Sequence, residues 1–207
     1  MKKILAVITA LSLILCFVSC KGKTVSHSNY EKIYNKYKDL KSYAANAEIT
    51  VVSNLTENTY KVRQYFLAPS SCKMEISSPD ELKGSGYSYH DGKIIMNSEF
   101  GKMTTVLDYI PEDRNYVFIS DFFENYYKSE DAFVETMNDF GTGECIVLKN
   151  VLSDSNPQRY SQSLWISSDD LTPVRLVTYD MEGKETLVVR FSEFKANCEI
   201  DDEIFSN

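Results

Sequence analysis

The chain has 207 residues, of which 43% are hydrophobic and 25% are charged, and its net charge is −8. This length suits one hydrophobic core of ordinary size and is too short for two, so we expect one globular domain besides any targeting segment. The acidic balance excludes nucleic acid as a partner, because phosphate binding depends on clustered Lys and Arg. It also makes surface charge a poor means of holding the whole chain at an anionic membrane.

The first residues have the pattern of a bacterial signal peptide. Lys2 and Lys3 precede an apolar run over 4–18, which is shorter than the roughly 20 residues of a membrane-spanning helix. We therefore expect a cleaved signal rather than a span, with ordinary secretion and a retained anchor as the alternatives.

The end of the apolar run predicts lipid attachment. The motif FVSC ends at Cys20 and is typical of a lipobox, in which a small residue precedes the cysteine that is lipidated and becomes the mature N-terminus. Phe17 is an unusual first residue for this motif, where Leu is common, and Cys16 is the weaker candidate because it follows bulky Leu15. The prediction is a signal peptide at 1–19, a lipidated Cys20 with its tether at 20–27, and a folded domain at 28–207.

A helix is expected from Ser28 to about Tyr43. Ser28 and Glu31 have the spacing of a capping box, in which each side chain binds a free backbone N–H of the other residue. Apolar residues then recur at helical spacing and define one buried stripe. These are Tyr30, Ile33, Tyr34, Tyr37 and Leu40.

Strands follow, because the period of the apolar residues changes from 3.6 to 2. The runs that indicate strands are 47–52, 60–67, 72–76, 87–89 and 94–96. The last two flank HDGK, whose central Asp-Gly suits a type I′ turn. We interpret His90 in this motif as a turn residue rather than a catalytic base, because neither a nucleophile nor a metal ligand stands beside it in sequence.

The middle of the chain interrupts the sheet. A strand is expected at 103–110, and 116–139 has an aromatic pattern with helical spacing, which predicts one or two helices laid on or into the sheet. Ser129 is placed to cap a second helix that buries Phe133 and Met137. One side of the first helix is expected to be buried against the sheet, and the alternative is that this side binds a protein partner. That side consists of Ile119, Phe122, Phe123 and Tyr126.

The last third is again rich in strands. They are expected at 144–151, 160–167, 173–179 and 186–194, with Gly183 in the final turn. About nine to eleven strands with few helices predict an α+β fold. Its main element is a strongly curved antiparallel sheet that forms an incomplete β-barrel, with the N-terminal helix and one or two central helices packed on or into it.

The folded domain holds three cysteines, Cys72, Cys145 and Cys198, and only His27 and His90 as further soft ligands. Their wide spacing contains no CxxC, so it indicates neither a metal site nor a redox motif. One disulfide with a free thiol and three buried thiols both remain open. The sequence also lacks GxSxG, HExxH and a Gly-rich phosphate loop, so we predict no catalytic residue, no cofactor and no enzyme activity.

One stretch carries a resemblance to a known family. The run LWISSDDLTPVRLVTYDMEGKETLVVRFSEFKAN at 164–197 and the tail CEIDDEIF at 198–205 resemble the closing hairpins of the LolA/LolB superfamily of envelope lipoprotein carriers. The amino-terminal helix, the segment QYFLAPSSCKMEI and the HDGK hairpin fit the same order, so the resemblance spans about 28–205. It implies a half-barrel whose apolar concave face binds lipid or lipoprotein.

In its lipobox and in its richness in Lys, Asn, Ile and Tyr, the chain is similar to the germination lipoproteins of clostridial spore formers. That likeness implies a non-catalytic lipoprotein, anchored on the extracytoplasmic face of the cell membrane, in the forespore or cortex space. Its partner would be an N-acetylmuramoyl-L-alanine amidase that starts cortex modification. A lipid or lipoprotein carrier is the alternative, and a sensor or scaffold is the third. A carrier needs an empty apolar cavity, whereas a regulator can fill its barrel and expose an aromatic or Met-bearing patch. Tyr65, Trp165, Tyr179 and the helix at 116–127 are the candidate patch residues.

Overall fold

The computed structural model describes residues 27–99, 103–108, 116–139 and 143–206. The signal peptide, Cys20 and most of the tether lie outside these residues and remain predictions. Neither described helix has the length and apolar character that crossing a membrane requires.

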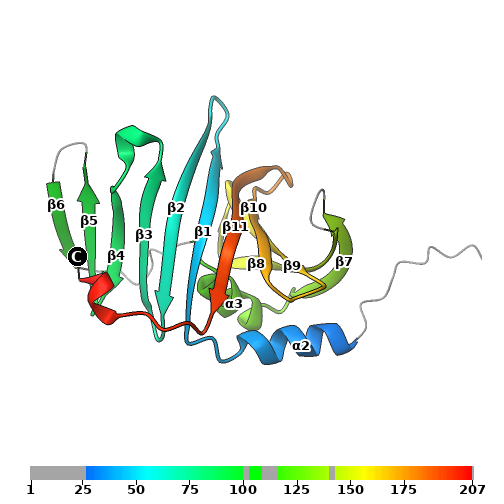
Figure 1. Ribbon diagram of the computed structural model, residues 1–207. Helices are drawn as coiled ribbons and strands as arrows, with labels where there is room; N and C mark the ends of the chain where they lie inside the picture. Colours follow the sequence, from blue (N-terminus) through cyan, green and yellow to red (C-terminus); the bar gives the residue numbers. More distant parts are fainter. Residues whose placement is uncertain (1–26, 100–102, 109–115, 140–142, 207) are drawn as a thin grey trace, which may run out of the picture.

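The described residues form one antiparallel sheet of eleven strands in the order β6-β5-β4-β3-β2-β1-β11-β10-β9-β8-β7 (Figure 1). Each strand pairs with its sequence neighbour except at the centre, where β1 pairs with β11. The first six strands are β1 Ser42–Val52, β2 Glu57–Leu67, β3 Ser71–Ser78, β4 Gly86–His90, β5 Lys93–Ser98 and β6 Met103–Asp108. The others are β7 Phe133–Asp139, β8 Gly143–Asn156, β9 Arg159–Ser167, β10 Pro173–Tyr179 and β11 Glu185–Ala196.

The sheet is an incomplete barrel, as predicted, and its two halves differ. Strands β7 to β11 curl tightly around helix α3 (Ile119–Lys128), whereas β2 to β6 form a flatter wing (Figure 1). Successive side chains alternate between the two faces of each strand, and apolar side chains gather on the inner face of the curled half. These side chains pack on α3, and this packing favours the curvature of the sheet around the helix. Leu148, Leu164, Leu176 and Val189 form one such row across four paired strands, and all are buried.

Helix α2 spans His27–Tyr37, so the prediction of a helix reaching Tyr43 was wrong at its C-terminal end. Tyr43 belongs to β1, where it pairs with Phe66 and Ala196 and is fully buried. The expected inner stripe is correct for Ile33 and Tyr37, which are buried. The Tyr37 hydroxyl donates to the Leu171 carbonyl at 2.6 Å, which fixes the end of α2 to the turn between β9 and β10.

The prediction of a second central helix, capped by Ser129, was also wrong. Residues 133–139 form strand β7, which pairs with β8 from Phe133↔Lys149 to Asp139↔Gly143. Backbone pairing with β8 therefore overrides the helical spacing of Phe133 and Met137. The Phe133 side chain is exposed rather than buried.

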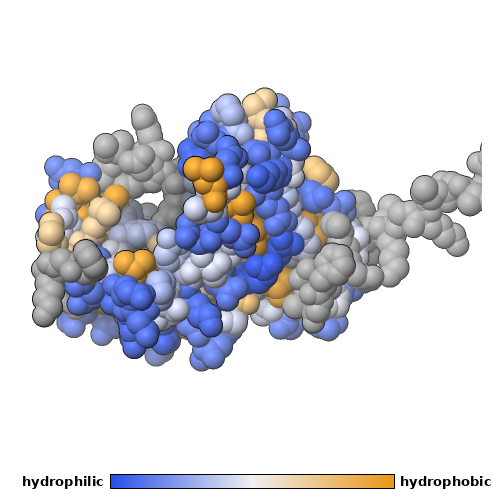
Figure 2. All heavy atoms as spheres, turned by 90° about the horizontal axis from the view of Figure 1, so that it is seen from above, coloured by the Kyte–Doolittle hydropathy of each residue, from blue (hydrophilic) through white to orange (hydrophobic). Residues whose placement is uncertain are grey.

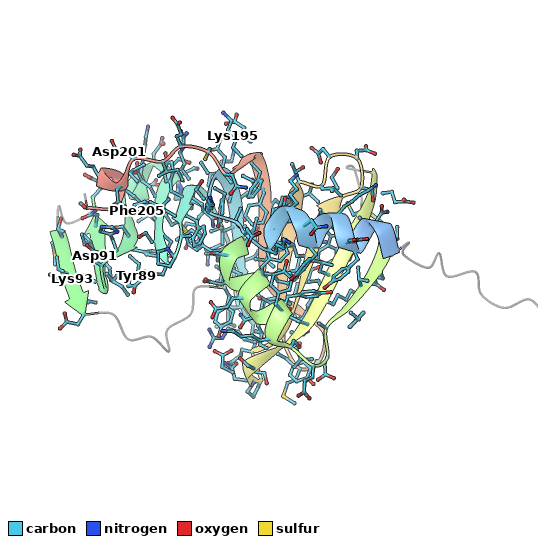
Figure 3. All side chains as sticks on the ribbon, turned by 90° about the horizontal axis from the view of Figure 1, so that it is seen from below. Tyr89, Asp91, Lys93, Lys195, Asp201 and Phe205 are labelled. Atoms are coloured by element: carbon cyan, nitrogen blue, oxygen red, sulfur yellow. The ribbon has the colours of Figure 1, made fainter. Side chains whose placement is uncertain are left out.

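The C-terminal tail crosses back to the wing and ends in a short 3-10 helix, η2 (Asp202–Phe205). Phe205 is fully buried there and stacks on the His90 ring at a centroid distance of 6.0 Å. The Lys73 ammonium also donates to the Ile204 carbonyl at 3.0 Å. The tail thereby braces β3 and β4 against the rest of the sheet (Figure 3).

Candidate functional site

Helix α3 fills the curled half of the barrel. Four of its large apolar side chains are buried, namely Ile119, Phe122, Phe123 and Tyr126, as the sequence pattern predicts. Phe122 stacks on Tyr126 at 5.7 Å, and Phe123 stacks on Tyr37 of α2 at 4.8 Å. Aromatic stacking adds to the stabilisation from burial. The space that a carrier would leave for an acyl chain is therefore occupied by protein in this half.

Buried polar side chains of the sheet position the start of α3. The Gln64 amide donates to the Val117 carbonyl at 3.2 Å, and the Gln162 amide donates to the Tyr116 carbonyl at 3.1 Å. The backbone N–H of Ile119 donates to the Tyr43 hydroxyl at 3.3 Å. Since buried backbone groups need partners, these three side chains satisfy the segment that precedes and begins the helix.

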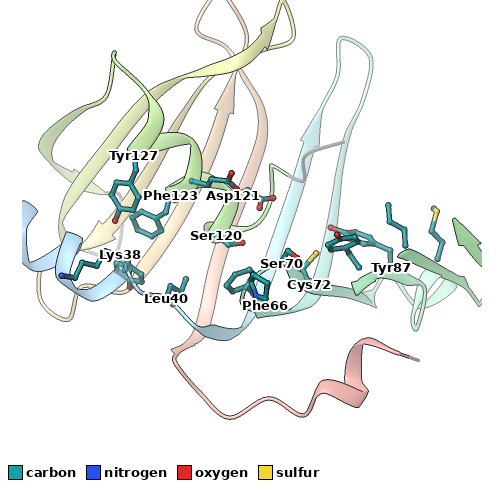
Figure 4. Close-up of a pocket in the computed structure, with 16 residues that line it drawn as sticks. Lys38, Leu40, Phe66, Ser70, Cys72, Tyr87, Ser120, Asp121, Phe123 and Tyr127 are labelled. Carbon is teal, nitrogen blue, oxygen red and sulfur yellow. The ribbon is translucent and has the colours of Figure 1, made fainter. Parts of the chain in front are cut away.

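The open half contains a cavity of about 720 Å³ between the wing, the end of α2 and the first turns of α3 (Figure 4). Aromatic and aliphatic side chains dominate its lining. They include Phe66, Tyr87, Tyr89, Ile94 and Met96 from the wing and Phe123 and Tyr127 from α3. The volume lies within the range of small-molecule sites. The cavity is the part of the structure that favours a carrier.

Charged and titratable groups surround this cavity. Burial raises the pKa of the Cys72 thiol to about 12, and the nearby carboxylate of Asp121 adds to the rise. Burial also holds the pKa of Tyr87 well above its ordinary value. Both groups are therefore neutral at physiological pH. Glu124 pairs with Lys128 at 2.6 Å, so its carboxylate is partly neutralised at the rim.

The outer strands of the wing expose a patch of large apolar side chains, which we call the Met patch. It consists of Met96, Met103 and Leu107, which are 48% to 63% exposed and lie on the same face of the wing, where Met96 also lines the cavity. Val106 pairs with Ile95 and points to the opposite face. The patch lies on β5 and β6, and β6 is the edge of the sheet in the described part of the chain. Apolar residues gather at this end of the molecule in the surface view (Figure 2). Met side chains adapt to irregular partner surfaces, so such a patch is typical of a protein-binding site.

Three residues that the sequence suggested for partner binding do not form an exposed patch. Trp165 is only 6% exposed and belongs to a second small core on the outer face of the sheet, beneath the Arg175 guanidinium at 5.0 Å. Tyr65 and Tyr179 are half-buried. The exposed patch is instead on β5 and β6 of the wing, whose sequence pattern is that of ordinary strands.

His90 is the last residue of β4, beside the turn, as predicted. In the fold, His90 contacts a residue that is distant in sequence. The Ser71 hydroxyl lies 2.9 Å from the Nδ1 of His90. Asp202 of the tail lies 3.8 Å from the same nitrogen. With Phe205 stacked on the ring, these contacts dock the tail on the wing.

The three cysteines of the domain are free thiols, and of them Cys145 is fully buried. The alternative with one disulfide is therefore wrong. Over the described ranges, the His, Cys, Asp and Glu side chains form no cluster that would hold a metal ion.

In the described residues an open, strongly curved antiparallel sheet wraps around helix α3. A family model described as sporulation protein YdcC-like matches residues 1–205, and the chain belongs to that family. A comparison with curated proteins found no match.

Solved structures share the fold. An uncharacterized conserved protein from Thermus thermophilus is 13% identical, with a TM-score of 0.56, over 87% of this chain and 91% of that chain. The structure of the CwlD amidase from Clostridioides difficile in complex with the GerS lipoprotein matches at 24% identity and a TM-score of 0.50, over 86% of this chain and 99% of that chain. The LolA superfamily protein NE2245 from Nitrosomonas europaea is 13% identical over 87% of this chain and 96% of that chain, with a TM-score of 0.45.

Proposed function

We propose that this protein is a non-catalytic lipoprotein that binds and regulates a cell-wall N-acetylmuramoyl-L-alanine amidase of the spore cortex. In this proposal the chain is held by lipid on Cys20 at the extracytoplasmic face of the membrane. The amidase cleaves the cell wall, and this protein contributes a binding surface. The family of sporulation proteins supports the biological setting. The GerS lipoprotein, which shares the fold, was solved in complex with the CwlD amidase.

The observation that carries the proposal is that one molecule combines a half-barrel filled by helix α3 with the exposed Met patch. Helix α3 fills the curled half of the barrel, and the wing exposes apolar side chains on its outer strands. Burying large, half-exposed apolar side chains stabilises a complex by roughly 25 cal/mol for each Å² removed from water. Because a few central residues dominate most interfaces, the Met patch should account for much of the affinity.

The test is a titration of the purified amidase of the same organism with the mature chain from Lys21. The variant M96S/M103S/L107S should bind the amidase at least about tenfold more weakly. A matched control is M181S/L55S, which removes two exposed apolar side chains from the turns after β10 and before β2, away from β5 and β6, and should bind as the parent does. Absence of binding by the parent chain, or equal binding by the Met-patch variant, would refute the assignment.

A lipid or lipoprotein carrier is the second candidate, and the cavity of about 720 Å³ is the specific observation that favours it. A bound lipid would lie against Phe66, Tyr87 and Ile94. Native mass spectrometry of the gently purified mature chain distinguishes the two candidates. Retained lipid that is lost when Ile94 is replaced by Asp would support a carrier, and a lipid-free mass would count against it.

A further inference from the structure

The end of the molecule nearest the predicted anchor carries a second exposed apolar surface, which is aromatic. Tyr34 of α2, Tyr127 of α3 and Phe133 of β7 are 41%, 39% and 53% exposed, and we call them the aromatic patch. They line a groove of about 590 Å³ together with Tyr30 and Ala132. The rings of Tyr34 and Tyr127 meet edge to face at 5.5 Å. Three separate elements therefore contribute to one continuous surface.

The chemistry of this patch suits a lipid headgroup region better than a dry protein interface. Tyrosine has an apolar ring and a polar hydroxyl, so it is favoured at membrane–water boundaries. Lysine ammonium groups lie over two of the rings, Lys38 over Tyr34 and Lys149 over Phe133, each at 5.6 Å. The Lys149 ammonium also pairs with the Glu135 carboxylate. Lys38 is therefore the cation of this patch that can approach a lipid phosphate while the rings enter the boundary.

The length of chain before α2 brings this patch close to the membrane. Residues 20–26 are the seven residues from the predicted lipidated cysteine to the start of the helix, and they span at most about 25 Å when fully extended. Tyr34 follows the start of α2 by about 10 Å along the helix axis. The patch therefore lies within reach of the headgroups whenever the anchor is inserted.

We propose that the aromatic patch rests on the lipid bilayer surface and orients the anchored protein. The wing with its Met patch lies at the opposite end of the sheet from the start of α2 (Figure 1). This orientation directs the Met patch away from the membrane, where an amidase in the cell wall can reach it. The orientation of the protein rests on the anchor that is included in the proposed function. The affinity of the aromatic patch for a bilayer surface does not require lipid on Cys20 and can be measured without it.

The test uses the mature chain from Lys21 without lipid and vesicles of phosphatidylcholine, with binding measured by sedimentation. The variant Y34S/Y127S/F133S should have a partition coefficient at least about tenfold lower than the parent. The variant Y34F/Y127F keeps the rings and should partition within about twofold of the parent. Equal urea midpoints would confirm that each variant is folded.

M96S/M103S/L107S is the matched control, because it removes apolar side chains of similar exposure at the other end of the sheet. It should bind vesicles as the parent does and lose the amidase, whereas the aromatic-patch variant should keep the amidase. A parent chain that does not bind vesicles would overturn the inference while leaving amidase binding untouched. Loss of amidase binding in Y34S/Y127S/F133S, with vesicle binding unchanged, would identify the aromatic patch as a protein interface and also overturn it.

Discussion

Replacing Gln64 with Leu should destabilise the protein by about 2–3 kcal/mol, although the two side chains have similar volume. Gln64 is fully buried, and its amide donates to the Val117 carbonyl at 3.2 Å. Its Oε1 accepts a hydrogen bond from the Tyr43 hydroxyl at 3.4 Å. Leaving a buried polar group without a partner costs about 1–3 kcal/mol, and the Val117 carbonyl loses its partner in this way. The Tyr43 hydroxyl loses its acceptor but still accepts from the Ile119 N–H, so it adds only a small further cost.

The same substitution should loosen α3 specifically, because Val117 lies just before this helix. Urea unfolding measures the total loss, and amide hydrogen exchange of 119–128 measures the local one. A double-mutant cycle with Tyr43→Phe should give a coupling energy of at least about 0.5 kcal/mol, since the two side chains are in contact. Gln158→Leu is the control, because this side chain is exposed, and it should change stability by less than about 0.5 kcal/mol. A loss below about 0.5 kcal/mol for Gln64→Leu would refute the role given to the buried glutamine.

Further predictions concern the anchor, the core and pH. Cys20→Ala should release or misprocess the protein in cells, and retention at the membrane with an unchanged mass would contradict the lipobox. Phe122→Ala should cost about 3–5 kcal/mol in urea unfolding, because it leaves a cavity in the filled half. Phe205→Ala should cost about 3 kcal/mol and increase exchange in β3 and β4. The raised pKa of Cys72 favours its neutral form in the folded state. This contribution to stability is fully present below pH 9.0, its ordinary pKa, and is lost as pH rises to about 12, which urea midpoints across this range would detect.

Much of the fold can be predicted from local pattern. Alternation along β2 specifies both the strand and its inner face, and the Asp-Gly of the HDGK turn specifies a hairpin. The two errors come from apolar spacing that two structures can share. Leu40 continues the helical stripe after Tyr37, and Phe133 and Met137 are four residues apart in a segment that is a strand only because β8 pairs with it.

The candidate site is less visible in the sequence, because exposure depends on where a strand lies in the sheet. Val106 and Leu107 resemble residues of any buried strand, yet they are exposed because β6 has no neighbour on one side among the described strands. The buried roles of Gln64 and Gln162 depend on contacts with a segment that is distant in the sequence from both. Such long-range contacts leave no local periodicity to detect.

The most direct test of the proposed function is the hydrolysis rate of the amidase on cortex peptidoglycan, measured with and without the mature chain. We expect the rate to rise with added protein until the amidase is saturated, and we expect the chain alone to release no product. M96S/M103S/L107S should give little stimulation at the same concentration. An unchanged rate at a saturating concentration of the parent chain, or product formed by the chain alone, would contradict the proposed function.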